Sequence, residues 1–229
     1  MDKIGDYLLN ILDWSEVWAM MIPLSVLLFY RQQSPSLRPV VVFVWLGFLV
    51  NIAIDVIMAI NLYLPGYPLT NNPLYNVQSI IRLSCFSFYF LQIQRDSFRK
   101  TKIVIGIVAA LFVLVNFLFF ERFVEFGAFS SNLFTSESYV LLIYCMLFYI
   151  AELKDDASNL FYNPHFWIVT GLSIYVVINF FVFLFYQPMV DMKNRLALDI
   201  WNVHNIAFVV FCLFLTKAFY GSARYQYSV

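Results

Sequence analysis

Charged residues are scarce in this sequence of 229 residues. Only 12% are Asp, Glu, Lys or Arg, about half the usual share in a soluble domain. The fourteen basic residues balance fourteen acidic ones, so nothing indicates the basic face that nucleic acids require. Hydrophobic residues make up 62% of the chain and aromatic residues 20%, more than one soluble core of this size encloses. The composition excludes a soluble globular protein, a disordered chain and a nucleic-acid-binding protein, and it predicts an integral membrane protein.

Cysteine and histidine are also rare. The cysteines Cys85, Cys145 and Cys212 lie in apolar segments, where a thiol usually behaves as a small hydrophobic group, so we predict neither a disulfide nor a zinc site. We expect His165 and His204 near opposite membrane faces, whereas catalytic zinc usually takes three protein ligands. The sequence has no phosphate-binding or dinucleotide-binding motif and no mid-membrane lysine for a retinal Schiff base. It therefore predicts no cofactor, no metal and no enzymatic activity.

Long apolar runs dominate what is present. A helix needs about 20 apolar residues to cross the hydrocarbon core, and continuous rather than alternating runs favour helices over a barrel. The stretches between the runs are too short to form a soluble domain. The sequence predicts one all-α domain, a polytopic bundle of seven transmembrane helices at about residues 14–30, 40–63, 74–94, 102–120, 137–152, 166–187 and 198–219. The fifth of these is short, and an extension into Leu153 or back past Thr135 is left open.

The basic residues of the loops predict the orientation, because cytoplasmic loops carry an excess of Lys and Arg. Seven spans place nine of these residues on one side and four on the other. We therefore expect a multi-pass protein of the cell inner membrane, with its N-terminus outside and its C-terminus in the cytoplasm. The most basic loop follows the third span. It is expected to anchor the topology, or to dock anionic lipid or a cytoplasmic partner, through Arg95, Arg99, Lys100 and Lys102.

Two ionisable residues stand out within the predicted spans. Asp55 in the second span and Arg82 in the third lie eight residues from the outer ends of those spans, which is roughly 12 Å at 1.5 Å per residue. An isolated charge is costly in hydrocarbon. Equal depth and opposite charge therefore predict an ion pair between these two side chains.

Other spans place polar side chains near the same depth. The third span carries a polar stripe at helical spacing, which predicts a central position for it. The fourth span is apolar except for Asn116 and is expected at the periphery, against lipid. In one interpretation the polar residues only hold the helices together. In the other they line an outer-half cavity for a small polar ligand, formed by Asp55, Gln78, Arg82, Tyr144, Tyr175, Asn179, His204 and Asn205.

Two segments near the end of the chain carry a resemblance. Residues 160–168 (LFYNPHFWI), with Tyr175 and residues 180–181 beyond them, and residues 201–206 (WNVHNI) resemble a group of seven-helix membrane proteins of Bacteroidota. That group is often encoded beside sensor histidine kinases and has no established activity. The resemblance covers mainly the last two predicted spans, and it implies a membrane sensor or accessory subunit.

The sequence therefore favours a receptor-like, sensory or accessory membrane protein that signals through a partner protein. A small-solute or proton-coupled transporter is an alternative. It predicts helices broken at the midplane, and the second to seventh spans lack a midplane proline. A structural membrane subunit is the third possibility. Membrane lipid is an expected partner in each case, and nucleic acid is not.

Overall fold

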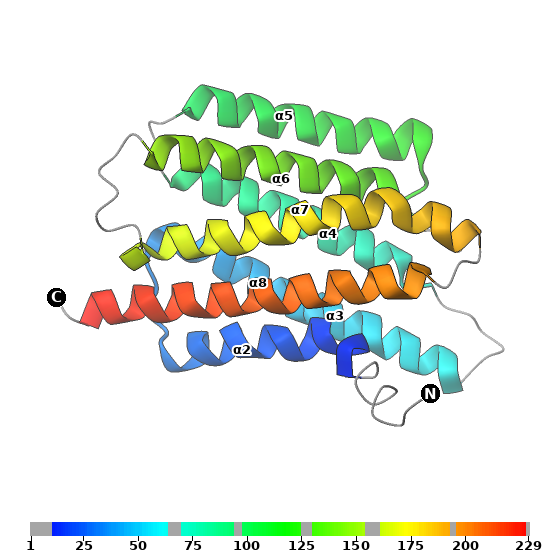
Figure 1. Cartoon of the computed structure of the whole chain (residues 1–229), viewed down its shortest axis with the longest axis horizontal. Coiled ribbons are helices and arrows are strands. Elements are labelled where there is room, and N and C mark those ends of the chain that lie inside the picture. The colour runs from blue at the N-terminus through cyan, green and yellow to red at the C-terminus, as the bar shows by residue number, and fades with distance from the viewer. Residues whose placement is uncertain are drawn as a thin grey trace.

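The chain folds as an all-helical bundle. The structure, a computed structural model, describes residues 11–63, 70–93, 98–124, 130–153, 161–192 and 196–227. Within these ranges there is no strand, so the predicted all-α class is confirmed. Figure 1 shows long helices that run side by side, up and down the same axis. The helices are α2 (Ser15–Phe29), α3 (Arg38–Tyr63), α4 (Asn72–Gln92), α5 (Arg99–Val115), α6 (Ser131–Glu152), α7 (Pro164–Asp191) and α8 (Leu196–Tyr227), with the short turns η1 (Pro35–Leu37) and η2 (Asn116–Phe120).

Local sequence explains where two of these helices begin. The side chain of Asn163 accepts a hydrogen bond of 3.0 Å from the backbone N–H of His165, and Pro164 occupies the first turn of α7, where its missing N–H costs nothing. The hydroxyl of Ser130 accepts from the backbone N–H of Leu133 at 3.3 Å. α6 therefore begins at residue 131, six residues before the predicted start of the fifth span.

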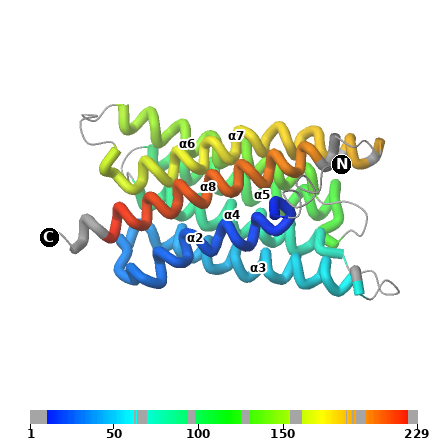
Figure 2. Tube along the Cα trace, turned by 60° about the horizontal axis from the view of Figure 1, so that its bottom comes forward, coloured from blue at the N-terminus to red at the C-terminus, as the bar shows by residue number. Residues whose placement is uncertain are grey.

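Six helices form a closed ring. Each packs on the next in the order α2, α8, α7, α6, α4 and α3, and α3 returns to α2. Among the described helices, α5 packs outside this ring against α4 and α6, at the edge of the bundle in Figure 1, whereas Figure 2 shows α2 between α8 and α3. Only 11% of the most apolar stretch of α5 is buried, which confirms the peripheral position predicted for the fourth span. The ring follows the order of the helices along the chain, except that α5 is left out, and it closes where α8 packs on α2.

Aromatic side chains fill the middle of the ring. The rings of Tyr175 and Phe211 stack with their centroids 5.2 Å apart. Phe86 lies 5.9 Å from Phe211 and 5.1 Å from Phe43. These residues come from α3, α4, α7 and α8, so one aromatic cluster holds four helices together.

In the part of the chain that the structure describes, five helices are long and apolar enough to cross a membrane, at Pro35–Asn61, Arg99–Phe120, Ser131–Glu152, Pro164–Val190 and Asp199–Ala223. This property indicates a membrane protein. The other two predicted spans differ from these five. α2 is apolar but has 15 residues, about 22 Å of helix. α4 has 21 residues, but polar side chains that face the ring lower its mean hydropathy.

Candidate functional site

A buried ion pair joins α4 to α6. Arg82 donates from Nε to Oε1 of Glu137 and from Nη2 to Oε2 at 2.8 Å, so the contact is bidentate. Ser79, one turn earlier on α4, donates its hydroxyl to the same carboxylate. Arg82 is 4% exposed and Glu137 is 1% exposed. Arg82 therefore neutralises the buried carboxylate, and Arg82 and Ser79 both donate hydrogen bonds to it. A buried charge needs both forms of compensation.

The predicted ion pair between Asp55 and Arg82 is wrong, because Glu137 occupies the guanidinium. The sequence prediction began the fifth span at Glu137 and so placed this residue at the membrane surface. In the structure Glu137 lies almost two turns inside α6. Asp55 is half-buried on α3, and its Oδ2 atom has no hydrogen-bond partner. It lies close enough to Glu16 for the two carboxylates to repel each other.

A second polar network joins α2, α7 and α8. Nε2 of His204 lies 3.0 Å from Oε1 of Glu16, and Nδ1 of His204 is hydrogen-bonded to Oδ1 of Asn179. The amide nitrogen of Asn179 donates to the backbone carbonyl of Tyr175 at 2.8 Å. A carbonyl only accepts, so this bond fixes the orientation of the Asn179 amide and turns its oxygen toward His204.

The position of one proton follows from this orientation. Oδ1 of Asn179 is an acceptor, so Nδ1 of His204 must carry its hydrogen. The contact between Nε2 of His204 and Oε1 of Glu16 then holds one further proton, on the imidazole or on the carboxyl. If this proton leaves, two acceptors face each other and the contact between α2 and α8 becomes repulsive.

Tyr175 connects the two networks. Its ring lies 5.1 Å from the guanidinium carbon of Arg82, a cation–π distance, and 5.9 Å from the imidazole centroid of His204. A small cavity lies beside it, with about 10 Å³ of space for the centre of a water molecule, the lower limit for one ordered water. Tyr175 and Gln78 both line this cavity, and the Tyr175 hydroxyl and Gln78 Oε1 are buried without a partner. One water molecule can bond to both.

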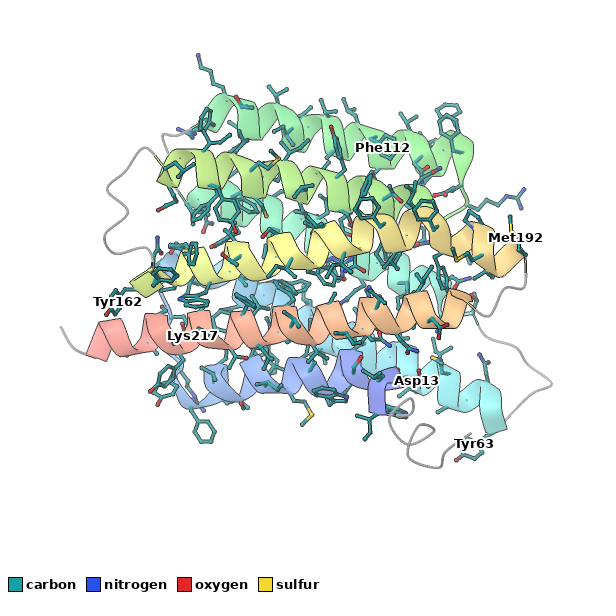
Figure 3. All side chains as sticks on the ribbon, in the orientation of Figure 1. Asp13, Tyr63, Phe112, Tyr162, Met192 and Lys217 are labelled. Carbon is teal, nitrogen blue, oxygen red and sulfur yellow. The ribbon has the colours of Figure 1, made fainter. Side chains whose placement is uncertain are left out.

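The structure brings together most of the predicted layer. Gln78, Arg82, Tyr175 and His204 line the cavity, and Asn179 bonds to His204. The position of Asp13 locates this layer along the bundle, because Glu16 follows Asp13 by about one helical turn. Figure 3 labels Asp13 toward the end of the bundle opposite Tyr162 and Lys217. The layer therefore lies in the half of the bundle nearer Asp13. The cavity has room for about one water molecule and not for a larger ligand in this conformation.

Two other predicted ligand-binding residues lie elsewhere. The Nδ2 atom of Asn205 donates to the backbone carbonyl of Leu12 at 3.1 Å and so ties α8 to the chain before α2. The hydroxyl of Tyr144 donates to the backbone carbonyl of Lys102 at 2.9 Å. Tyr144 is thirteen residues into α6 rather than seven into a shorter span, about 20 Å from the start of the helix. It is therefore too deep to join the layer.

The basic residues after the third predicted span do not all face solvent. Arg99 and Lys100 are exposed, and Arg95 lies outside the described residues. Lys102 is 1% exposed, and its Nζ donates to the backbone carbonyl of Ile93 at 3.2 Å. An ammonium group at the C-terminal end of α4 interacts favourably with the unpaired carbonyls there. Lys102 is therefore a helix cap, and its charge does not face a partner.

The sequence prediction missed Glu16, Glu137 and Ser79. Glu16 was included in the first predicted span, but two residues from its beginning, where an acidic residue is unremarkable in a helix. Glu137 was placed at the beginning of the fifth predicted span, so it was not counted among the ionisable residues within the spans. A carboxylate near the end of a short predicted span is a candidate partner for an arginine within another span.

Comparisons with protein-family models, with curated proteins and with solved structures find no match to this chain. Within the described ranges, no group of three or more His, Cys, Asp or Glu side chains is arranged to hold a metal ion. The functional argument therefore rests on the two buried networks.

Proposed function

We propose that the chain is a multi-pass sensory or accessory protein of the cell inner membrane that signals through a partner protein. The observation that carries this proposal is the pair of connected polar networks, Arg82–Glu137 and Glu16–His204–Asn179, buried where α2, α4, α6, α7 and α8 meet. Buried ionisable groups in a membrane bundle are a functional signal by default. Here they couple five helices.

The proposal includes seven spans, with the N-terminus outside. α2 and α4 are members of the closed ring, so they lie beside helices that are apolar enough to cross. The buried residues of α4 include Asn76, Gln78, Ser79 and Arg82. Polar groups turned inward are compatible with a helix that crosses the bilayer, because the ring shields them from lipid. The orientation follows from the excess of basic residues in the loops at one side.

The proposed input is the proton held between Glu16 and His204. Loss of this proton separates α2 from α8, and His204 transmits the change to α7 through Asn179. The other ionisable groups near the pair are Asp55, Tyr75, Arg82, Glu137 and Tyr175. The cavity has room for no more than about one water molecule, so a shift of a proton is a better fit to the site than a small polar ligand.

Co-purification tests this proposal. A tagged chain is purified from its native membrane in mild detergent, and bound proteins are identified by mass spectrometry. We expect a reproducible signalling partner with the unchanged chain and with Asp13→Asn, which alters an exposed carboxylate outside the network. The partner is expected to change in amount with Glu16→Leu. A chain that is always recovered alone, or a partner that responds equally to both variants, contradicts the proposal.

Proton-coupled transport is the second candidate, because the same proton-holding pair serves a relay. Proton flux into proteoliposomes distinguishes the two functions. A transporter shows a proton flux that Glu16→Gln abolishes, because a glutamine amide cannot take up and release a proton as a carboxyl group does. A sensory protein shows no flux above that of empty vesicles. If neither flux nor a partner is found and only folding suffers, the networks serve as structural contacts.

A further inference from the structure

An elongated apolar groove runs along the outside of the bundle between α4 and α5. It has a volume of about 470 Å³, within the ~300–1,000 Å³ range of ligand pockets. Small residues on both helices leave this space open, and Tyr144 of α6 also lines it. Residues that line it include Ser84, Phe88 and Leu91 of α4 and Ile103, Gly106 and Ala110 of α5.

A second hollow continues the groove at one end. It measures about 570 Å³ and shares Leu91 and Ile103 with the groove. Arg38 and Arg99 line it, both exposed and neither in an ion pair with a described residue. Gln92 adds an exposed amide. A space with apolar walls thus opens into a space with two guanidinium groups, and both Arg38 and Arg99 belong to the basic side of the predicted topology.

We infer that the groove and the hollow together bind one anionic phospholipid. An acyl chain lies between α4 and α5, and the phosphate of the headgroup is held by Arg38 and Arg99. Guanidinium groups bind phosphate oxygens through two parallel hydrogen bonds, and basic pockets between membrane helices recognise anionic headgroups. Lys102 does not compete for the phosphate, because its ammonium is bound to the Ile93 carbonyl.

The position of α5 favours a lipid over a protein partner. This helix packs outside the ring, and the exposed residues beside the groove, such as Phe88 and Ile107, are apolar. Such a surface faces hydrocarbon when the helix spans the membrane. The inference rests on the proposed membrane placement of α4 and α5, but not on signalling.

Lipid retention by the purified full-length chain tests the inference. Native mass spectrometry measures the binding of phosphatidylglycerol and of phosphatidylcholine with the same acyl chains. We expect phosphatidylglycerol to be retained preferentially. Each of Arg38→Gln and Arg99→Gln is expected to weaken it roughly fivefold, as the attraction of one basic residue to an anionic membrane surface predicts. Lys100→Gln, an exposed charge that does not line the hollow, is the matched control and is expected to change little.

A second pair of variants tests the groove itself. Ala110→Trp places an indole where the acyl chain lies, whereas Val108→Trp places one on the exposed surface of α5 beside it. We expect loss of lipid with the first variant only. Circular dichroism checks that each variant keeps its helices, and lipid retention is compared only among variants that do. Equal loss with Lys100→Gln, no loss with Ala110→Trp, or full competition by inorganic phosphate overturns the inference. Because no partner protein is present, this result is independent of the proposed signalling.

Discussion

Arg82 and Glu137 form a buried ion pair, with the two side chains 4% and 1% exposed. Removing one partner of a buried ion pair leaves the other charge unpaired, which typically costs about 3–5 kcal/mol. We therefore expect Glu137→Leu to lower the stability of the detergent-solubilised protein by an amount of this order. Thermal unfolding followed by circular dichroism measures it.

The double variant Arg82→Met with Glu137→Leu provides the control. Replacing both members of a buried pair with apolar residues is often close to neutral, so the double variant is expected to be more stable than either single one. Asp55→Asn is expected to have a small effect, because Asp55 forms no contact with Arg82. A loss with Asp55→Asn as large as that with Glu137→Leu would revive the pairing predicted from the sequence.

Glu16 offers a sharper residue-scale experiment, because its amide analogue keeps the hydrogen bond. In Glu16→Gln the amide nitrogen can donate to Nε2 of neutral His204, whose Nδ1 hydrogen still bonds to Asn179. In Glu16→Leu the buried Nε2 has no partner, which typically costs about 1–3 kcal/mol. We expect thermal unfolding near that of the unchanged protein for the first variant and at a clearly lower temperature for the second. Equal effects of the two variants would mean that the contact is packing rather than a hydrogen bond.

At the scale of the element, α7 and α8 approach each other closely at Gly171. A Cβ atom added to Gly171 would lie 2.4 Å from Cβ of Phe214, so the glycine is required by space and not by backbone conformation. We expect Gly171→Ala to push the helices apart and to destabilise the protein by roughly 1–3 kcal/mol, the usual cost of overpacking. Gly221→Ala on α8 meets no atom within 4 Å and is the matched control. A neutral Gly171→Ala in thermal unfolding would contradict this packing.

The apolar pattern predicted most helix ends to within a few residues but failed where polar residues continue a helix, as at the last predicted span, which ends at residue 219 whereas α8 ends at Tyr227. The predicted sixth span at 166–187 corresponds to Pro164–Asp191, because the length of the apolar run alone sets the extent of this helix. The predicted fifth span at 137–152 corresponds to Ser131–Glu152, because the serine-rich first two turns are helical and buried by neighbouring helices. That difference of six residues moved Glu137 inward and Tyr144 deeper, and it accounts for two of the site errors.

The polar stripe of α4 was predicted because it is periodic. Gln78, Arg82 and Tyr89 are buried as the spacing predicts. Their partners could not be predicted in the same way, because they depend on the order of helices in space. α4 packs on both α3 and α6, and the rotation of α4 turns Arg82 toward Glu137 of α6, while the closure of the ring brings α2 beside α8, far away in sequence. The depth of a residue along a helix axis can be counted from the sequence, whereas the rotation of the helix about that axis cannot be.

At the scale of the whole molecule, the ring of six helices determines where the two buried polar networks lie. It encloses both networks, while α5 lies outside with one buried apolar side. Interhelical contacts in lipid gain nothing from excluding water, so close packing and polar contacts hold such bundles together. The aromatic cluster around Tyr175 and the two networks above it supply these contacts. The arrangement therefore predicts a bundle in which α5 contributes little to the stability of the other six helices.

The proposed orientation can be tested at the two ends of α7. Tyr162 is 84% exposed and Met192 is 77% exposed, and Figure 3 shows them at opposite ends of the bundle. The helix between them has 28 residues, about 42 Å, which exceeds the ~30 Å hydrocarbon core. With the N-terminus outside, a membrane-impermeant thiol reagent applied to intact cells is expected to label Met192→Cys and not Tyr162→Cys. Permeabilised cells should label both. The unchanged chain controls for Cys85, Cys145 and Cys212, which lie within helices. Labelling of Tyr162→Cys alone would invert the topology, and labelling of both in intact cells would show that α7 does not cross.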